Sequence, residues 1–241
     1  MTSRFDRQIL LPQVGEAGQD KIKNSAVTVF GCGGLGSPVL TYLACAGVGS
    51  LRIVDFDAVS ESNLNRQFIH GEASIGENKV ASAARAIKAL NSGIHVEPLN
   101  VIIDDTSIDE LIKGSDVLID CTDNIATRLI INKGALRFGV PLVEGGINGF
   151  IGFVLCVDRE HACLSCLGYK QAKSNEAIPV IGATAGVIGT LQAMECLKII
   201  LGCGNSLFGT MLHYNGLAGS FDRISVNTNK KCGFHEWHAA K

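Results

Sequence analysis

The chain has 241 residues, of which 46% are hydrophobic and 18% are charged, and its formal net charge is −2. This length and hydrophobic content are enough to bury a core without disulfides, which argues against an intrinsically disordered chain. The near balance of acidic and basic residues also argues against a dedicated nucleic-acid binder, because such proteins usually carry a basic excess.

Strand-like apolar runs alternate with helical patterns through the first half of the chain. The runs predict strands at residues 26–30, 50–54, 95–99, 116–120 and 141–144. Apolar residues with the period of an α-helix predict helices at residues 35–46, 79–90 and 124–137. Strands separated by helices of this length form parallel sheets with right-handed crossovers, so we expect a Rossmann-like, doubly wound α/β fold.

The pattern changes after about residue 147. Residues 150–157 and 219–226 predict two further strands, and a long helical pattern at about 185–201 lies between them. We expect this part to extend the same sheet with antiparallel strands and to carry partner contacts. The chain is therefore interpreted as a single domain, residues 1–241, with a first half at residues 1–146 and a second half at residues 147–241.

The sequence predicts neither a membrane span nor a secretory signal. Residues 177–194 form the most apolar stretch, but Pro179, glycines and Gln192 interrupt it and Glu195 follows at once, which favours a core helix. The first seven residues lack the apolar segment of a signal peptide. We therefore expect a cytoplasmic protein that does not bind membranes.

Gly31–Gly36 (GCGGLG) matches the G-x-G-x-x-G pattern, directly after one predicted strand and directly before a predicted helix. Glycines here allow a tight turn and a close approach of the backbone to phosphate, which the N–H groups of the following helix can bind. Asp55 ends the second strand, where a carboxylate can accept hydrogen bonds from ribose hydroxyls. Taken alone, these features favour NAD as the ligand over a glycine turn that binds nothing.

The residues beyond Asp55 suit a triphosphate better than a nicotinamide. Asn63–Gln67 (NLNRQ) and Lys79 supply amides and two cations that can neutralise phosphate charge. Asp120–Asn124 (DCTDN) follows the fourth strand at the sheet edge where open α/β sheets bind ligands. A carboxylate at that place, beside a triphosphate, is a suitable Mg²⁺ ligand.

A series of motifs follows in order along nearly the whole chain. They are RFDRQ at residues 4–8, GCGGLG at 31–36, DFD at 55–57, NLNRQ at 63–67, Lys79, DCTDN at 120–124, CLSC at 163–166 and GTLQAME at 189–195. Together they resemble the ThiF/MoeB/HesA adenylyltransferases, a family related to ubiquitin-activating enzymes. The resemblance implies binding of ATP and Mg²⁺ and adenylation of a ubiquitin-like protein, often a sulfur carrier that ends in Gly-Gly.

The resemblance also implies roles for individual residues. Gly33 and Gly34 would lie at the phosphates, Asp55 would bind the ribose, and Asp123 would hold Mg²⁺. Arg7 would reach across a homodimer to the ATP of the partner subunit. The triphosphate would be bound by polar residues that follow the second strand: Asn63, Arg66, Gln67 and Lys79. Residues 1–146 would thus bind the nucleotide, and residues 147–241 would bind the carrier and a zinc ion.

Adenylation needs no general base, because a terminal glycine carboxylate is already ionised at neutral pH. Its attack on the α-phosphate forms an acyl adenylate and releases pyrophosphate. Catalysis then depends on alignment and on cations that stabilise the developing charge. We expect Arg7, Arg66, Lys79 and the Mg²⁺ held by Asp123 to supply that stabilisation.

Cys163 and Cys166 have the spacing of half a tetrahedral zinc site. Cys232 and His235 supply a second pair, although His238 or His161 could replace His235, and similar proteins carry a second Cys-x-x-Cys pair instead. The odd total of nine cysteines favours metal ligation over disulfides, so we predict a structural zinc rather than free thiols. Four protein ligands leave no open position for catalysis at such a zinc.

Some members of the family transfer the activated carrier to a cysteine of their own, in the loop before the long helix. Residues 167–184 contain no cysteine here, so a covalent step in that loop has no nucleophile. Cys196 is predicted to pack inside the helix, which leaves Cys203 as the remaining candidate. We therefore expect the enzyme to stop at the acyl adenylate and to depend on a separate sulfur donor. Four more cysteines lie in apolar or glycine-rich segments and are also predicted to be buried: Cys32, Cys45, Cys121 and Cys156.

Two other functions are compatible with part of the pattern. An NAD-dependent oxidoreductase is supported by Gly31–Gly36 and Asp55 alone. A nucleotide-binding scaffold without turnover would require loss of motif residues, and the motifs show no such loss. The sequence does not identify the carrier, nor whether its pathway makes thiamin, molybdopterin, cysteine or another product.

Overall fold

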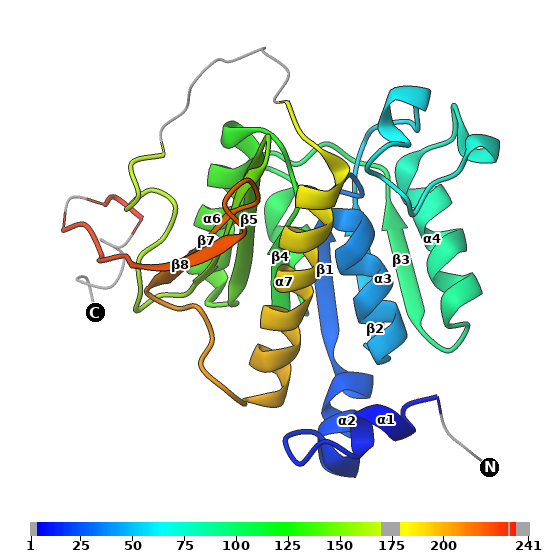
Figure 1. Cartoon of the computed structure of the whole chain (residues 1–241), viewed down its shortest axis with the longest axis horizontal. Helices are drawn as coiled ribbons and strands as arrows, with labels where there is room; N and C mark the ends of the chain where they lie inside the picture. The colour runs from blue at the N-terminus through cyan, green and yellow to red at the C-terminus, as the bar shows by residue number, and fades with distance from the viewer. Residues whose placement is uncertain (1–3, 170–178, 231, 235–241) are drawn as a thin grey trace.

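The computed structural model describes residues 4–169, 179–230 and 232–234 and shows one eight-stranded sheet with helices on both faces (Figure 1). The strand order is β3-β2-β1-β4-β5-β6-β7-β8. The strands are β1 Ala26–Phe30, β2 Ser50–Val54, β3 His95–Leu99, β4 Val117–Asp120, β5 Leu142–Asn148, β6 Ile151–Val157, β7 Thr210–Asn215 and β8 Ser220–Ser225. The helices are α1 Asp6–Ile9, α2 Gly15–Asn24, α3 Gly36–Ala46, α4 Lys79–Leu90, α5 Ile108–Ile112, α6 Ile125–Phe138 and α7 Gly182–Leu201, with short 3₁₀ turns at Glu61–Asn63 and Glu72–Ser74.

The first five strands pair in parallel, which confirms the predicted doubly wound fold. Their register aligns the last residues of three strands, because Phe30 of β1 pairs with Val54 of β2 and with Asp120 of β4. Asp120 also pairs with Glu144, which lies inside β5. Because parallel strands point the same way, the segments after β1, β2 and β4 emerge at one edge of the sheet. This edge is called the carboxyl edge below.

The last three strands extend the sheet in antiparallel fashion, as predicted from the change of pattern after about residue 147. A tight hairpin joins β5 to β6 through Gly149, whose φ of +59° lies in the left-handed region that glycine adopts without strain. Strand β7 was not predicted. All of its residues are only half-buried, so its sequence lacks the apolar run that marks β1 or β4.

Helices α3, α4 and α7 cover one face of the sheet, and α5 and α6 cover the other (Figure 1). Side chains of β1 alternate between the two layers, since Val27 and Val29 join the core under α3 and α7, whereas Phe30 joins the core with α5 and α6. The predicted helices are confirmed, with ends shifted by a few residues. The helices α1, α2 and α5 were not predicted. Few side chains of α1 and α2 are buried and apolar, and α5, although largely buried, has only five residues, which is too short to show a helical period.

Among the described residues, α7 is the one helix that is long and apolar enough to cross a membrane by length and composition. In the structure, it packs on the sheet and against α3, and Ala185, Ile188 and Cys196 are fully buried there. A Cβ at Gly189 would lie 2.5 Å from the Leu35 carbonyl oxygen, so glycine allows α7 to approach α3 closely. The helix is therefore a core element of the α/β layer, as predicted.

Candidate functional site

The glycine loop joins β1 to α3 at the carboxyl edge and is tightly packed. Gly31 has a φ of +96°, and a Cβ there would lie 2.8 Å from the carbonyl oxygen of Cys121. A Cβ at Gly36 would lie 2.1 Å from the carbonyl oxygen of Gly31. Side chains at these two positions would clash with the backbone of the turn. Gly33 is half-buried, and a Cβ added there would lie at ordinary contact distance from its neighbours. The first and last glycines of the motif therefore shape the loop.

Asp55 holds this loop from the end of β2. Its carboxylate accepts a hydrogen bond from the Cys32 N–H at 2.8 Å and another from the Asp57 N–H at 2.9 Å. Each carboxylate oxygen retains a further acceptor position, and the side chain is only half-buried. The predicted position of Asp55, beside the glycine loop at a strand end, is what the structure shows.

His70 also holds the glycine loop, and it was not predicted. Its Nε2 lies 3.0 Å from the carbonyl oxygen of Cys32, and its Nδ1 lies 2.9 Å from Ser82 Oγ on α4. Burial lowers the pKa of His70, so the ring is neutral and can donate to Cys32 from Nε2 while accepting from Ser82. Asp55 and His70 thus fix the N–H and the carbonyl of Cys32. No sequence motif marks this pairing, because residues 32 and 70 meet only in the folded chain.

The NLNRQ motif begins with Asn63, the last residue of the first 3₁₀ turn, and its other residues follow that turn. Asn63 Oδ1 accepts from the Ser60 N–H at 3.2 Å and so closes that turn. Arg66 is half-buried and donates to the carbonyl oxygen of Ser62 at 2.9 Å. Gln67 is buried, and its Oε1 has no hydrogen-bond partner among the described residues. Its Nε2 would lie 3.4 Å from a Cβ at Gly33, so Gln67 adjoins the glycine loop.

Lys79 begins α4 and is almost fully buried, with 7% of its side chain exposed. Its Nζ lies 2.8 Å from Asp57 Oδ2, whose side chain is half exposed. The structure thus places the predicted phosphate ligand in an ion pair with the second aspartate of the DFD motif. No role was predicted for Asp57 from the sequence.

Asp123 lies between β4 and α6, and its side chain is exposed. The next residue, Asn124, caps α6 through its Oδ1, which accepts from the Thr127 N–H at 2.8 Å. The preceding residue, Thr122, is held by buried charged groups that are described below. An exposed carboxylate on a fixed turn at the carboxyl edge is able to bind a hard cation.

Arg7 does not lie near these residues. It is exposed on α1, which lies beneath the sheet, at the bottom of Figure 1, whereas the glycine loop lies at the opposite end of β1. Gln8 and Gln19 tie α1 and α2 to the carbonyl oxygen of Ala46 at the end of α3. Arg7 and the glycine loop of the same chain therefore lie at opposite ends of strand β1.

Three cysteines come together in the second half of the chain. The Cys163 Sγ lies 3.9 Å from the Cys166 Sγ and 3.7 Å from the Cys232 Sγ, and all three sulfur atoms lie within 4.8 Å of one another. Burial raises the pKa of Cys163 to about 12, an unfavourable setting for a thiolate without a cation. His161 does not join this cluster, since its Nδ1 lies 2.9 Å from Asp158 Oδ1. His235 and His238 lie outside the described residues, so the fourth position is not observed.

The remaining cysteines differ from expectation at one position. Cys32, Cys121, Cys156 and Cys196 are buried, as predicted, and burial raises the pKa of Cys196. Cys45 is exposed, so the prediction of burial was wrong there. It lies in an apolar stretch of sequence, but α3 turns this position away from the sheet, because one face of an amphipathic helix always points outward. Cys203, just after α7, is half-buried.

Comparison with known proteins gives full-length relatives. Residues 5–234 match the sequence model of the ThiF family. The chain is 37% identical over 235 residues to the SAMP-activating enzyme E1 of Haloferax volcanii, covering 95% of this chain and 87% of that protein. It is 39% identical over 234 residues to the molybdopterin-synthase adenylyltransferase of Escherichia coli, covering 95% and 94%.

A third relative is longer than this chain. The adenylyltransferase and sulfurtransferase MOCS3 of Mus musculus is 41% identical over 235 residues, which cover 94% of this chain and 51% of that protein. Among solved structures, E. coli MccB with ATP has a TM-score of 0.86 at 23% identity, covering 97% of this chain and 74% of that one. This structural likeness supports the fold alone.

Proposed function

Because the chain belongs to the ThiF family, we propose that it is an ATP-dependent adenylyltransferase that activates the C-terminal carboxylate of a ubiquitin-like sulfur carrier. The observation that carries the proposal is similarity, over nearly their whole length, to an archaeal activating enzyme and a bacterial adenylyltransferase. None of these three relatives is named as an oxidoreductase, so the NAD-dependent alternative rests on the glycine loop and Asp55 alone.

The residues at the carboxyl edge fit ATP. Asp55 has acceptor positions left for ribose hydroxyls while it holds the glycine loop. The loop leads into the N-terminus of α3, whose N–H groups favour anions. The buried Gln67 Oε1, which lacks a partner within the described residues, lies on the side chain that adjoins Gly33 and is available to a ligand donor there.

In the proposed reaction, a carboxylate oxygen of the carrier attacks the α-phosphorus of ATP. A new P–O bond forms while the bond to the leaving pyrophosphate breaks, so no proton transfer is required. Arg66 would bind the triphosphate by charge-assisted hydrogen bonds, with Asn63 and Gln67 as neutral partners. Lys79 would exchange Asp57 for a phosphate oxygen, since an ion pair with a half-exposed aspartate leaves the ammonium able to change partners.

Asp123 is the proposed ligand of Mg²⁺. Its exposed carboxylate supplies the oxygen donor that this ion prefers, at the edge where the triphosphate would lie. When bound, Mg²⁺ would neutralise charge on the phosphates. The contribution of the protein is to hold Asp123 on a turn whose neighbours on both sides are hydrogen-bonded.

Arg7 is proposed to complete the site of a second copy in a homodimer. Its position on α1, at the opposite end of β1 from its own glycine loop, leaves it available to the nucleotide of a partner subunit. Exposed apolar side chains follow it along the chain, since Leu10 is 75% exposed and Leu11 is 51% exposed. Such residues are suited to burial in a subunit interface.

The second half, residues 147–241, is proposed to bind the carrier and a structural zinc. The hairpin of β7 and β8 leaves Leu217, Phe221 and Ile224 exposed, which offers an apolar contact surface. Cys163, Cys166 and Cys232 would bind zinc with His235 as the fourth ligand, and the ion would tie the C-terminal segment to the loop after β6.

The activated carrier is proposed to leave as the acyl adenylate and to react with a separate sulfur donor in the cytoplasm. Residues 167–184 supply no thiol, and Cys196 is buried with a raised pKa, which disfavours the reactive thiolate. Cys45 is exposed but lies in the last turn of α3, at the end of that helix remote from the glycine loop.

ATP–pyrophosphate exchange that depends on an added carrier protein tests the proposal. An adenylyltransferase incorporates labelled pyrophosphate into ATP only when the carrier carboxylate is present. A carrier whose C-terminal carboxylate is converted to an amide is the matched control. Binding of NAD with no exchange would support the oxidoreductase instead, and ATP binding with no exchange would support a scaffold without turnover.

A further inference from the structure

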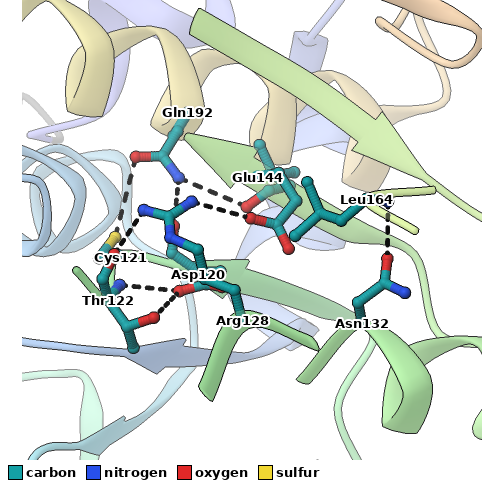
Figure 2. Close-up of polar contacts among 9 residues, drawn as sticks. Asp120, Cys121, Thr122, Arg128, Asn132, Glu144, Leu164 and Gln192 are labelled. Carbon is teal, nitrogen blue, oxygen red and sulfur yellow. Dashed lines mark hydrogen bonds and ion pairs between the residues drawn. The ribbon is translucent and has the colours of Figure 1, made fainter. Parts of the chain in front are cut away.

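Three charged side chains are buried together beneath the turn that carries Asp123 (Figure 2). Asp120 ends β4 and Glu144 lies on β5, and both are 0% exposed. The two residues are direct partners in the parallel register, so their side chains leave the sheet side by side. Arg128 comes from the second turn of α6 and is 7% exposed.

Asp120 and Arg128 bond all the polar atoms of Thr122, and Glu144 contacts Arg128. Asp120 Oδ1 accepts from the Thr122 N–H and from the Thr122 hydroxyl, each at 2.7 Å. Arg128 donates from Nη2 to the Thr122 carbonyl oxygen and from Nη1 to Glu144 Oε2 at 3.3 Å. Because Thr122 directly precedes Asp123, the buried charges fix one side of the turn that presents Asp123, and the Asn124 cap fixes the other.

Helix α7 supports the same strand end. Gln192 donates from Nε2 to the backbone carbonyl oxygen of Asp120 at 2.7 Å (Figure 2). A Cβ at Gly145 would lie 2.4 Å from Gln192 Cδ, so only glycine next to Glu144 leaves room for this contact. The backbone at Asp120 is therefore fixed independently of its carboxylate.

The charges of the cluster do not balance if both carboxyl groups are ionised. One arginine would then face two carboxylates in a site closed to water, and an unpaired buried charge is costly. Asp120 Oδ2 and Glu144 Oε1 are both buried without a hydrogen-bond partner in the described part of the chain. A proton between the two carboxyl groups removes the excess charge and supplies the missing hydrogen bond.

Titration of the pair agrees with this geometry. Burial, reinforced by the charge of Asp120, raises the pKa of Glu144 well above its usual range, and burial also raises the pKa of Asp120. Within the described residues, Tyr169 and Cys121 are the other titratable groups that act on Arg128. Burial raises the pKa of each of them as well, so both are neutral at physiological pH.

We propose that Asp120 and Glu144 share one proton and, with Arg128, form an electrically neutral positioning unit for the turn that carries Asp123. The role in magnesium binding rests on the function proposed above, through Asp123, whereas the shared proton does not. Glu144 is a positioning residue in this scheme, because it acts through Arg128 and Asp120 and touches neither nucleotide nor metal.

The scheme predicts how isosteric substitutions combine. In Glu144→Gln, the ionised Asp120 still balances Arg128, and an amide replaces the protonated carboxyl group. In Asp120→Asn, Glu144 can ionise and balance Arg128. The double variant leaves Arg128 buried without a counterion, so its effect exceeds the sum of the two single effects.

The first measurement is the melting temperature of the nucleotide-free protein against pH. Because the folded pKa of Glu144 is raised, its contribution to stability is complete below the unfolded pKa of about 4.3 and is lost as pH rises towards the folded pKa. The wild type should therefore lose melting temperature relative to Glu144→Gln as pH rises from that value through neutrality. If the melting temperatures of the two proteins depend on pH in the same way, the proposal of a shared proton is wrong, and this outcome does not depend on whether the protein adenylates a carrier.

The second measurement is the Mg²⁺ concentration that gives half-maximal carrier-dependent exchange. We expect Glu144→Gln to stay near the wild-type value and the double variant to need ~10- to 100-fold more, as is typical when partners of a metal ligand are removed. Should the double variant fail to fold, Thr122→Val provides the test, since it removes one hydrogen bond to Asp120 and leaves the charges in place. It should raise the Mg²⁺ requirement severalfold with little change in melting temperature.

An unchanged Mg²⁺ requirement in the folded double variant, or in Thr122→Val, would overturn the positioning role. An equal increase of the Mg²⁺ requirement in Glu144→Gln and in the double variant would also overturn the positioning role. Absence of exchange in the wild-type protein would instead contradict the proposed function, and the melting curves would still decide whether the proton is shared.

Discussion

The two halves of the sheet differ in how they hold the groups that we assign to function. In the parallel half, the segments after β1, β2 and β4 meet at one edge, and buried side chains such as His70 and Arg128 fix their backbone by hydrogen bonds. In the antiparallel half, the candidate groups are a cluster of three thiols beside β6 and apolar side chains on the exposed hairpin of β7 and β8. The parallel half is therefore organised around preformed turns, and the antiparallel half around contact surfaces.

This difference separates catalysis from stability in the proposed enzyme. Preorganised groups at the carboxyl edge should control the rate of adenylation, because catalysis by charge stabilisation depends on their positions. The thiol cluster should control the stability of the C-terminal segment. Substitutions in the two halves should thus have distinct signatures, and the following predictions run from the largest expected effect to the smallest.

Replacing Arg66 or Asp123 by alanine should cause the largest loss. Each removes a charge at the carboxyl edge, and the loss of one such electrostatic contact typically lowers the rate by ~10²- to 10³-fold. The melting temperature should change little, because Asp123 is exposed and, among the described residues, the hydrogen bonds of Arg66 stay within its own loop. The measurement is carrier-dependent exchange together with thermal melting.

Lys113→Ala is a matched control for these variants, because Lys113 is an exposed cation in the segment before β4, at the opposite end of that strand from Asp123. It should exchange at the wild-type rate. Exchange near the wild-type rate in Arg66→Ala or Asp123→Ala would show that the assignment of the carboxyl edge is wrong.

Arg7→Ala should also abolish most exchange, but its defect should be rescued by mixing. Combining Arg7→Ala protein with Asp123→Ala protein allows heterodimers in which one site has both residues intact, so partial activity should return. Subunit exchange is verified with differently tagged chains. A mixture no more active than the separate variants would contradict the contribution of Arg7 across the dimer.

Substitution in the thiol cluster should lower stability and leave the rate per folded molecule nearly unchanged. Cys163→Ser removes the sulfur that contacts both other thiols, and each ~1 kcal/mol lost lowers the melting temperature by about 2–4 °C in a chain of this size. A zinc chelator should act in the same way on the wild type. Cys203→Ser is the control and should change neither the melting temperature nor the exchange rate. A Cys163→Ser variant with a normal melting temperature and no exchange would contradict this assignment, because the thiol cluster would then control the rate and not the stability.

The smallest expected effect is on the mass of the enzyme itself. Incubation with carrier and Mg–ATP, followed by intact-mass spectrometry without reductant, should show the enzyme at its unmodified mass. Cys45, Cys196 and Cys203 are the thiols to examine, because the first is exposed and the other two lie on or just after α7. A conjugate lost on mutation of one of them would show that a covalent step follows adenylation.

The sequence predicted most of the parallel half because its local signals agree with its tertiary structure. The apolar run of β1 ends at Gly31, and that of β2 ends at Asp55, so strand ends and site residues coincide. The sequence could not show contacts that depend on register or crossovers. Glu144 was predicted as a strand residue, but its pairing with Asp120 is set by the alignment of β4 with β5.

Other differences have equally specific causes. The contact of His70 with Cys32 joins segments that are distant in sequence, and no local pattern marks it. The ion pair of Lys79 with Asp57 likewise depends on how the loop after β2 folds back on α4. The predicted zinc site is represented by its three cysteines, and the identity of its fourth ligand is still a prediction.

The most direct test of the account is the mass of the carrier after reaction. With the enzyme, Mg–ATP and pyrophosphatase, a carrier that ends in Gly-Gly should gain the mass of one adenylyl group, and Arg66→Ala enzyme should leave it unchanged. A carrier that stays unmodified under these conditions, while the enzyme is folded and binds ATP, would contradict adenylation at the carboxyl edge.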